Sequence, residues 1–138
     1  MVKKHLARML NRRGDEFAES AIAFPIVVLL LIALFNLALA AFAANNASNA
    51  ANYGARIGSV QQHGATGAAY AAAMQSISHA PVGDYQIGVA GGGFPGATIR
   101  VDVTWNVPNY MAPLMSFFGG SPGDLSGSAS STFRQEGW

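Results

Sequence analysis

Three carboxylates stand at the start of the longest apolar run in the chain. Asp15, Glu16 and Glu19 follow a basic tail and precede residues 20–55, which carry no charged side chain. Carboxylates in the first turn of a helix favour the positive end of its dipole by about 0.3–1 kcal/mol each. This effect accounts well for Asp15 and Glu16. It accounts less well for Glu19, which abuts the apolar run, where a carboxylate is costly and usually has a positive partner.

Other groups that could do chemistry do not form a recognisable site. His5, His63 and His79 are far apart and share no metal-ligand spacing, and the chain has no cysteine. Residues 116–131 are rich in serine but lack a credible base, and the Gly91–Gly93 run precedes neither a helix nor a lysine that could reach a phosphate. The sequence therefore predicts no enzymatic activity, no cofactor and no metal.

The carboxylates must be positioned by the apolar segment that follows them. Residues 21–44 are almost uninterruptedly apolar, and about 20 such residues cross a bilayer core of roughly 30 Å. We therefore expect a transmembrane helix. Pro25 removes a backbone donor and is predicted to kink or loosen this helix. Asn36, the other interruption, is predicted to form a local or interhelical hydrogen bond.

The N-terminal segment also has features of a secretory signal peptide. Its basic start fits, and residues 38–40 and 41–43 resemble A-x-A cleavage sites. The apolar run is longer than an ordinary signal core, and a secretory signal gains nothing from the acids at residues 15–19. A membrane anchor is the favoured interpretation.

Charge distribution predicts the orientation of this anchor. The net charge of the 138-residue chain is only +1, which indicates no nucleic-acid partner. Most of the lysines and arginines nevertheless precede Gly14. By the positive-inside rule, the N-terminus should stay in the cytoplasm and the C-terminal part should cross the membrane. Roughly 80–90 residues then remain for one small domain.

Beyond the apolar run we expect the helix to continue to about Val60. Asn45, Asn49 and Asn52 recur at spacings that place them on one helix face. Two interpretations remain open for this face: contact with a neighbouring chain, or simple solvation. A short amphipathic helix is predicted at residues 68–78 after a turn at residues 63–67. Its core-facing positions should be Tyr70, Met74 and Ile77.

The remainder is predicted to form strands at residues 85–89, 97–107 and 124–134. The middle strand alternates most clearly between apolar and polar residues, whereas residues 108–123 are predicted to be a long loop with apolar tips. The short connections favour a small antiparallel sheet packed on the helices. The expected core face of the middle strand comprises Ile99, Val101, Val103, Trp105 and Val107.

The predicted fold class is therefore α+β, with a long N-terminal transmembrane helix, a second short helix and a small antiparallel sheet. We expect three parts: a basic leader at residues 1–14, the extended helix at residues 15–62, and a small extracytoplasmic domain at residues 63–138.

The segment GDEFAESAIAFPIVVLLLIALFNLAL, followed by NAANYGARIGSV, resembles known sequences. It is similar to the class III signal of type IV pilin-like proteins and to the TadE-like pseudopilins of tight-adherence pilus systems. The resemblance implies that a prepilin peptidase cuts after Gly14 and leaves Asp15 as the new N-terminus. Glu19 matches the glutamate of the motif. The chain departs from the family in carrying Ala-Glu-Ser where many members have Val-Glu-Phe, and Asn36 near the position of a second glutamate.

The resemblance implies a structural subunit or assembly component of a bacterial tight-adherence pilus, located in the inner membrane or in a pilus on the cell surface. Implied partners are the prepilin peptidase, other pilin subunits, the pilus assembly platform and membrane lipid. Glu19 would set the register of assembly by pairing with the amino terminus of a neighbour at Asp15. Two alternatives remain: an anchored extracytoplasmic binding protein that joins no filament, and, less favoured, a membrane-bound enzyme.

Overall fold

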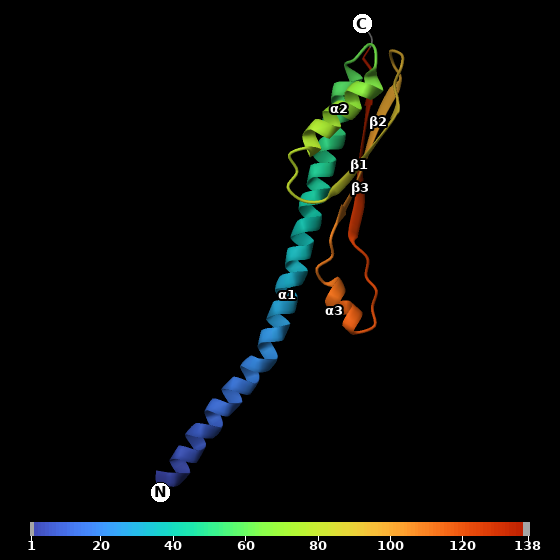
Figure 1. Ribbon diagram of the computed structural model, residues 1–138. Coiled ribbons are helices and arrows are strands. Elements are labelled where there is room, and N and C mark those ends of the chain that lie inside the picture. The colour runs from blue at the N-terminus through green and yellow to red at the C-terminus, as the bar shows by residue number, and fades with distance from the viewer. Residues whose placement is uncertain (1, 137–138) are drawn as a thin grey trace. The chain divides into compact units, whose positions relative to one another are not determined.

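The computed structural model describes the backbone of residues 2–136 and the side chains of residues 17–136 (Figure 1). The chain divides into two compact units, Met1–Phe35 and Asn36–Trp138. The element order is three helices and three strands, α1-α2-β1-β2-α3-β3. The predicted α+β class is confirmed, while the boundaries predicted after residues 14 and 62 stay predictions.

Helix α1 (Val2–Ser59) continues through Pro25 and ends close to the predicted Val60. Between Phe17 and Phe35 no side chain is buried, although almost every residue there is apolar. A stretch this long and apolar is sufficient to cross a bilayer, and it suggests single-pass membrane anchoring.

The sheet is antiparallel, with strand order β1-β2-β3. Strands β1 (Asp84–Gly91) and β3 (Leu125–Arg134) flank β2 (Thr98–Val107), so that β2 pairs on both edges. The predicted alternation in β2 is confirmed: its odd-numbered residues from 99 to 103 are fully buried and Val107 is also buried. Trp105, also predicted to face the core, is only partly buried, and its ring lies against Gly127 of β3.

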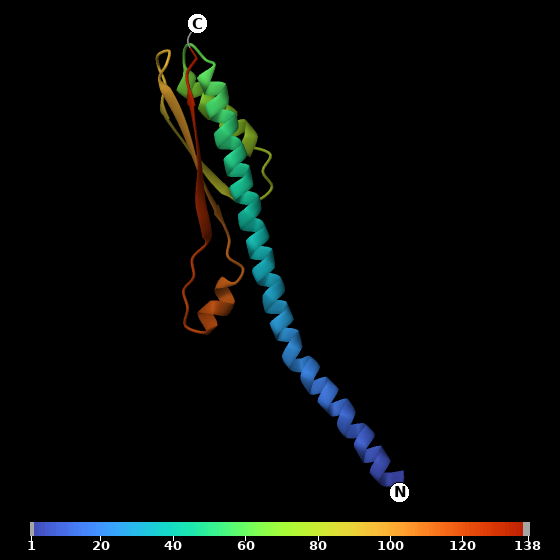
Figure 2. The ribbon, with the colours of Figure 1, turned by 180° about the vertical axis from the view of Figure 1, so that it is seen from behind.

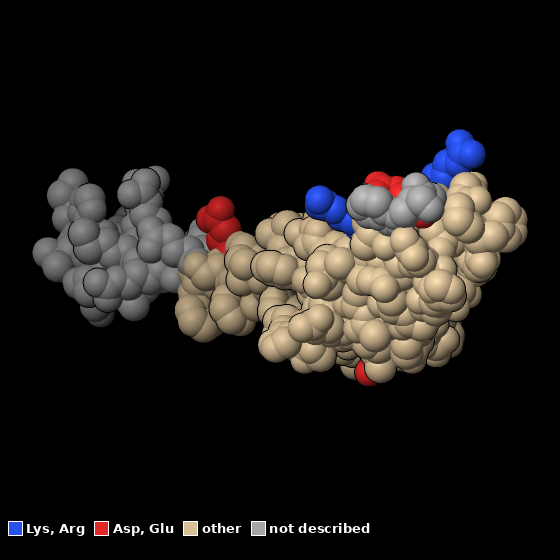
Figure 3. All heavy atoms as spheres, turned by 90° about the horizontal axis from the view of Figure 1, so that it is seen from above, with Lys and Arg blue, Asp and Glu red and all other residues tan. Residues whose placement is uncertain are grey.

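The opposite face of the sheet is polar. Arg100 and Asp102 form an exposed ion pair there, with 2.8 Å between Nη2 and Oδ1. Such exposed pairs contribute little to stability. Charged side chains are few on the face shown in Figure 3, where uncharged residues cover most of the surface. This face of the described residues is thus mainly uncharged.

The other face of the sheet packs on helix α2 (Ala65–Ile77) and on the C-terminal part of α1, as both views show (Figures 1 and 2). The two helices meet through small residues. A Cβ at Gly54 would lie 2.8 Å from the carbonyl oxygen of Ala69, and one at Gly58 would lie 2.8 Å from the Cβ of Ala69. The buried alanines of the two helices are Ala43, Ala47, Ala50, Ala51 and Ala55 of α1 and Ala65, Ala69, Ala72 and Ala73 of α2.

The predicted core face of α2 was largely wrong. Tyr70 and Met74 are 46% and 49% exposed, and only Ile77 packs against the core. The alanines face α1 instead, because only side chains of their size fit the close approach of the two helix backbones. Large apolar residues are therefore displaced to the outer side of α2.

Two local predictions also need correction. The turn predicted at residues 63–67 ends early, because α2 begins at Ala65 after Gly64, whose φ of 66° suits glycine. The long loop predicted at residues 108–123 contains a short helix, α3 (Ala112–Phe117). Pro113 lies in its first turn, where the missing amide costs no helical hydrogen bond.

The buried side chain of Gln135 joins three distant segments. Its Nε2 donates to the carbonyl oxygen of Gln61, and its Oε1 accepts from the Gly93 amide at 3.1 Å. Its backbone amide donates to Ala97, while the next amide donates to Ser59. Gln135 therefore holds the end of α1, the β1–β2 loop and the C-terminal segment together.

We expect Gln135→Ala to destabilise the domain. The substitution leaves the Gly93 amide and the Gln61 carbonyl without their partner, and each unsatisfied buried group costs about 1–3 kcal/mol. Thermal unfolding of the full chain in detergent, followed by near-ultraviolet circular dichroism, measures the loss. The control is Gln86→Ala, because Gln86 is an exposed glutamine on β1. Equal unfolding temperatures for the two variants would contradict this role.

Candidate functional site

The predicted site residues all belong to the N-terminal half of α1. The side chains of residues 2–16 lie outside the described residues, and the predicted cleavage pair Gly14 and Asp15 is among them. Glu19 is described and exposed, and within residues 17–136 it has no ion-pair partner. Pro25 is accommodated inside the helix. Cleavage, the kink and the assembly role of Glu19 all stay predictions.

Within the first unit, the described helix surface around Glu19 and Pro25 is apolar and exposed. A surface of this size is unfavourable in water and needs lipid or other apolar helices around it. The exposed large side chains on it are Phe17, Ile22, Phe24, Ile26, Val27, Leu29, Leu30, Leu31 and Leu34.

Asn36 begins the second unit and is only 6% exposed. Its Nδ2 donates to Oδ1 of Asn109 at 2.8 Å, and its Oδ1 accepts from the amide of Tyr110 at 3.1 Å. The predicted hydrogen bond exists, but the prediction of a local or interhelical partner was wrong. The partner lies in the segment between β2 and α3, so Asn36 fastens that segment to α1.

Asn109 is the second half of this contact. Its Oδ1 also accepts from the amide of Met111 at 3.0 Å, and its Nδ2 donates to the carbonyl oxygen of Gly123 at 3.1 Å. Through this one amide side chain, both ends of the segment that contains α3 are attached to helix α1. Sequence reasoning missed Asn109. Its only signal was an asparagine directly after Pro108 at a strand end, where such a side chain often bonds the backbone two residues on.

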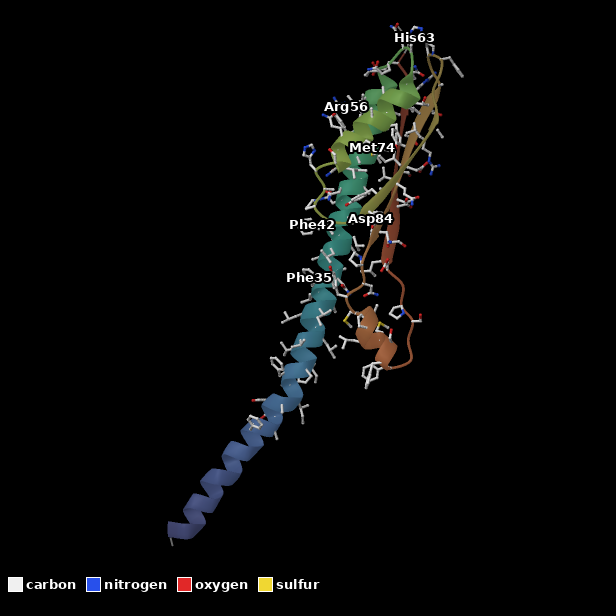
Figure 4. All side chains as sticks on the ribbon, viewed as in Figure 1. Phe35, Phe42, Arg56, His63, Met74 and Asp84 are labelled. Carbon is white, nitrogen blue, oxygen red and sulfur yellow. The ribbon has the colours of Figure 1, made fainter. Side chains whose placement is uncertain are left out.

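The asparagine face of α1 is exposed in the single chain. Asn45, Asn49 and Asn52 all face outward, and Asn49 donates to Asn45 at 3.3 Å. Phe42, labelled in Figure 4, is also exposed on α1, one turn before Asn46. Both interpretations of this face, solvation and contact with a neighbour, remain open.

The described histidines are not brought together with acidic residues. His79 lies near Ser78 and the carbonyl of Gln75 at the end of α2, and His63 lies at the far end of the domain (Figure 4). Among residues 17–136, no group of three or more His, Asp or Glu side chains is placed to hold a metal ion. The most distinctive feature of the described chain is therefore the exposed apolar helix with its Asn36 contact.

The family model for TadE-like proteins matches residues 17–56. The matched segment begins just before Glu19 and ends at Arg56, so it includes both the uncovered apolar surface and the alanine-rich part that packs on α2. The match confirms the resemblance found in the sequence. No curated protein and no solved structure matches the chain.

Proposed function

With residues 17–56 assigned as a TadE-like segment, we propose that the chain is a TadE-like pseudopilin. It serves as a structural subunit or assembly component of a bacterial tight-adherence pilus, and it has no enzymatic role. The observation that carries this proposal is the coincidence of the family match with a helix whose described residues expose a long apolar surface.

An uncovered apolar helix suits a protein with two successive environments. Before assembly, lipid would surround residues 17–35 and anchor the protein in the inner membrane. After assembly, equivalent helices of neighbouring subunits would replace the lipid. In either environment the buried surface would be the same, so the helix would need no refolding between them.

The basic residues before Gly14 support a cytoplasmic N-terminus and an extracytoplasmic domain. A prepilin peptidase would cut after Gly14 and expose the amino group of Asp15. In the assembled bundle this amino group would lie against Glu19 of a neighbouring subunit. The assembly platform and other pilin subunits would then contact the chain through α1.

N-terminal sequencing of the protein isolated from its native membrane tests the processing step. We expect the mature chain to begin at Asp15. A chain that retains the basic tail, and that is absent from sheared surface filaments, would favour the alternative of an anchored binding protein.

We expect Gly14→Leu to block processing. The peptidase must bring its catalytic groups close to the backbone at the cut, and a residue without a Cβ allows this approach. The variant should migrate more slowly than the mature protein, by the mass of residues 1–14. Asn11→Ala, a change within the same tail, should be processed normally. Normal processing of Gly14→Leu would argue against peptidase cleavage at this position.

A further inference from the structure

We propose that the outer face of α1 binds the same face of a second copy of the chain, with the two helices parallel and in register. We name this face the asparagine seam and define it as Phe42, Asn45, Asn49 and Asn52. All four residues belong to the second unit of the structure. The inference rests on the proposed function and deepens it, because it assigns a site of self-recognition to the chain.

The asparagine seam lies opposite the face of α1 that packs on the domain. At about 100° per residue, Asn49 lies about 200° around the helix from the buried Ala47. All four seam residues are exposed, and Phe42 is 62% exposed. Figure 4 shows Phe42 on the side of α1 that points away from the sheet. A partner could therefore reach the seam without displacing α2 or the sheet.

The spacing within the seam is that of a coiled-coil interface. Residues 42, 45, 49 and 52 are separated by steps of three, four and three, which is the pattern of the a and d positions of a heptad. Side chains at this spacing form a stripe that stays in contact with a single partner helix. The spacing therefore indicates that the occupant of the seam is another helix.

The chemistry of the seam favours contact over simple solvation. A solvated helix face normally carries charged side chains, but residues 20–55 have none. Asparagine is also a poorer helix former than alanine, glutamate or lysine, so solvation alone gives no reason for three of them. Asn49 donates to Asn45 at 3.3 Å, and Asn52 has no side-chain partner among residues 17–136. Donors and acceptors of the seam thus remain for another chain.

A second copy of this chain is the helix that fits the seam. An amide carries both donors and an acceptor, so an asparagine can pair with the same asparagine of an identical helix. Asparagine at an a position, here Asn49, specifies register and the number of helices in a coiled coil. Copies anchored in one membrane by the same N-terminal helix would also run in the same direction, which makes their α1 helices parallel.

Arg56 limits the seam at its C-terminal end. It is exposed, it occupies the next position in the same spacing, and it projects from the same side of α1 as Phe42 (Figure 4). Two parallel copies would bring the two arginines near each other. Their long side chains can keep the charged groups in water, so we expect the contact to end at Asn52.

Single cysteines can test this contact, because the chain has no cysteine of its own. Asn45→Cys, Asn49→Cys and Asn52→Cys are each made in the full chain, at low expression in membranes of the native host. After oxidation with copper phenanthroline, dimers are separated on a non-reducing gel. A disulfide requires Cα atoms within about 7 Å. Ser48→Cys is the matched control, because position 48 lies beside Asn49 in the helix but about 100° away from it around the axis.

We expect the dimer fraction at positions 45, 49 and 52 to exceed that at position 48 at least fivefold. Asn49→Asp in the Asn52→Cys chain should lower cross-linking to the level of Ser48→Cys, because two like charges would face each other. Asn49→Gln in the same chain keeps an uncharged amide and should retain most of the dimer. The near-ultraviolet circular dichroism of the Asn49→Asp chain should be unchanged, since the seam lies outside the core. A face that is only solvated would accept aspartate without any change in cross-linking.

Equal cross-linking at all four positions would overturn the proposal, because random collision would explain it. Cross-linking at position 49 alone would indicate antiparallel helices that cross there, and would also overturn it. So would a mixture of Asn45→Cys and Asn49→Cys chains that forms more dimer than either chain alone, because the helices would then be shifted by one turn.

N-terminal sequencing of the same samples separates this inference from the proposed function. Absent cross-links in a chain that begins at Asp15 and enters filaments would overturn the seam alone. Seam cross-links in a chain that keeps its basic tail and is absent from filaments would support the seam and contradict the pilus role.

Discussion

Replacement of Gly58 by alanine is expected to lower substantially the stability of the domain that α2, the sheet and the C-terminal part of α1 form. A Cβ at this position would lie 2.6 Å from Cδ1 of Ile99, 2.8 Å from Cβ of Ala69 and 2.9 Å from the carbonyl oxygen of Ala65. The isoleucine tip could rotate away, but the two groups on α2 are held by the helix. Overpacking of this kind costs about 1–3 kcal/mol, a large part of the 5–15 kcal/mol that stabilises a typical domain.

The matched control is Gly67→Ala on α2. No atom lies within 4 Å of a Cβ at Gly67, and alanine favours a helix over glycine by about 0.8–1.0 kcal/mol. The same chemical change should therefore destabilise at position 58 and stabilise at position 67. Thermal unfolding of the full chain in detergent, read by near-ultraviolet circular dichroism, distinguishes the two. A Gly58→Ala variant as stable as Gly67→Ala would show that α1 and α2 are not in such close contact.

Glu19→Gln is expected to yield a processed, membrane-resident protein that fails to enter the filament or complex. In an apolar bundle, loss of the carboxylate would leave the amino terminus of a neighbour without its counter-charge. Breaking a buried pair in this way costs about 3–5 kcal/mol. The measurement is the ratio of sheared or complex-bound protein to membrane protein, compared with the unsubstituted chain. Insertion and cleavage should both survive, since neither requires this carboxylate.

Glu16→Gln is the control for the helix-dipole explanation. In the processed chain, which would begin at Asp15, both substitutions remove one carboxylate close to the helix start, so the dipole alone would make both mild. Only the counter-charge role predicts a severe loss of assembly for Glu19→Gln and a mild effect for Glu16→Gln. Normal incorporation of Glu19→Gln would remove the counter-charge role and return Glu19 to being a helix-end acid.

Local sequence pattern was sufficient to predict α1, α2 and the three strands of this protein, but not the short helix α3. Period-two alternation in residues 97–107 predicted β2 and its buried face, and the uninterrupted apolar run predicted the exposed helix. The same run carried the family resemblance, which the match to residues 17–56 confirms. These features are readable because each depends on neighbours in the sequence, or on the contrast between apolar and polar faces of one element.

Pattern failed where contact between elements decided the outcome. Tyr70 and Met74 had the spacing of a core face, yet alanines occupy the buried face of α2. The distance between α1 and α2 leaves no room there for larger side chains. The short distance between the two helices depends on Gly54 and Gly58, which lie in α1 and not in α2. Hydrophobicity alone gives no measure of it.

The sequence by itself determined the helix with its apolar surface, the three strands and the acids that precede the apolar run. Only the tertiary structure decided the partners of Asn36 and Gln135. Asn36 binds Asn109, and Gln135 binds Gln61, across more than seventy residues of chain in each case. A buried amide must be hydrogen-bonded, so the sequence required that partners exist. Which groups met that requirement depended on how the helices and the sheet pack in three dimensions, a property that no local spacing records.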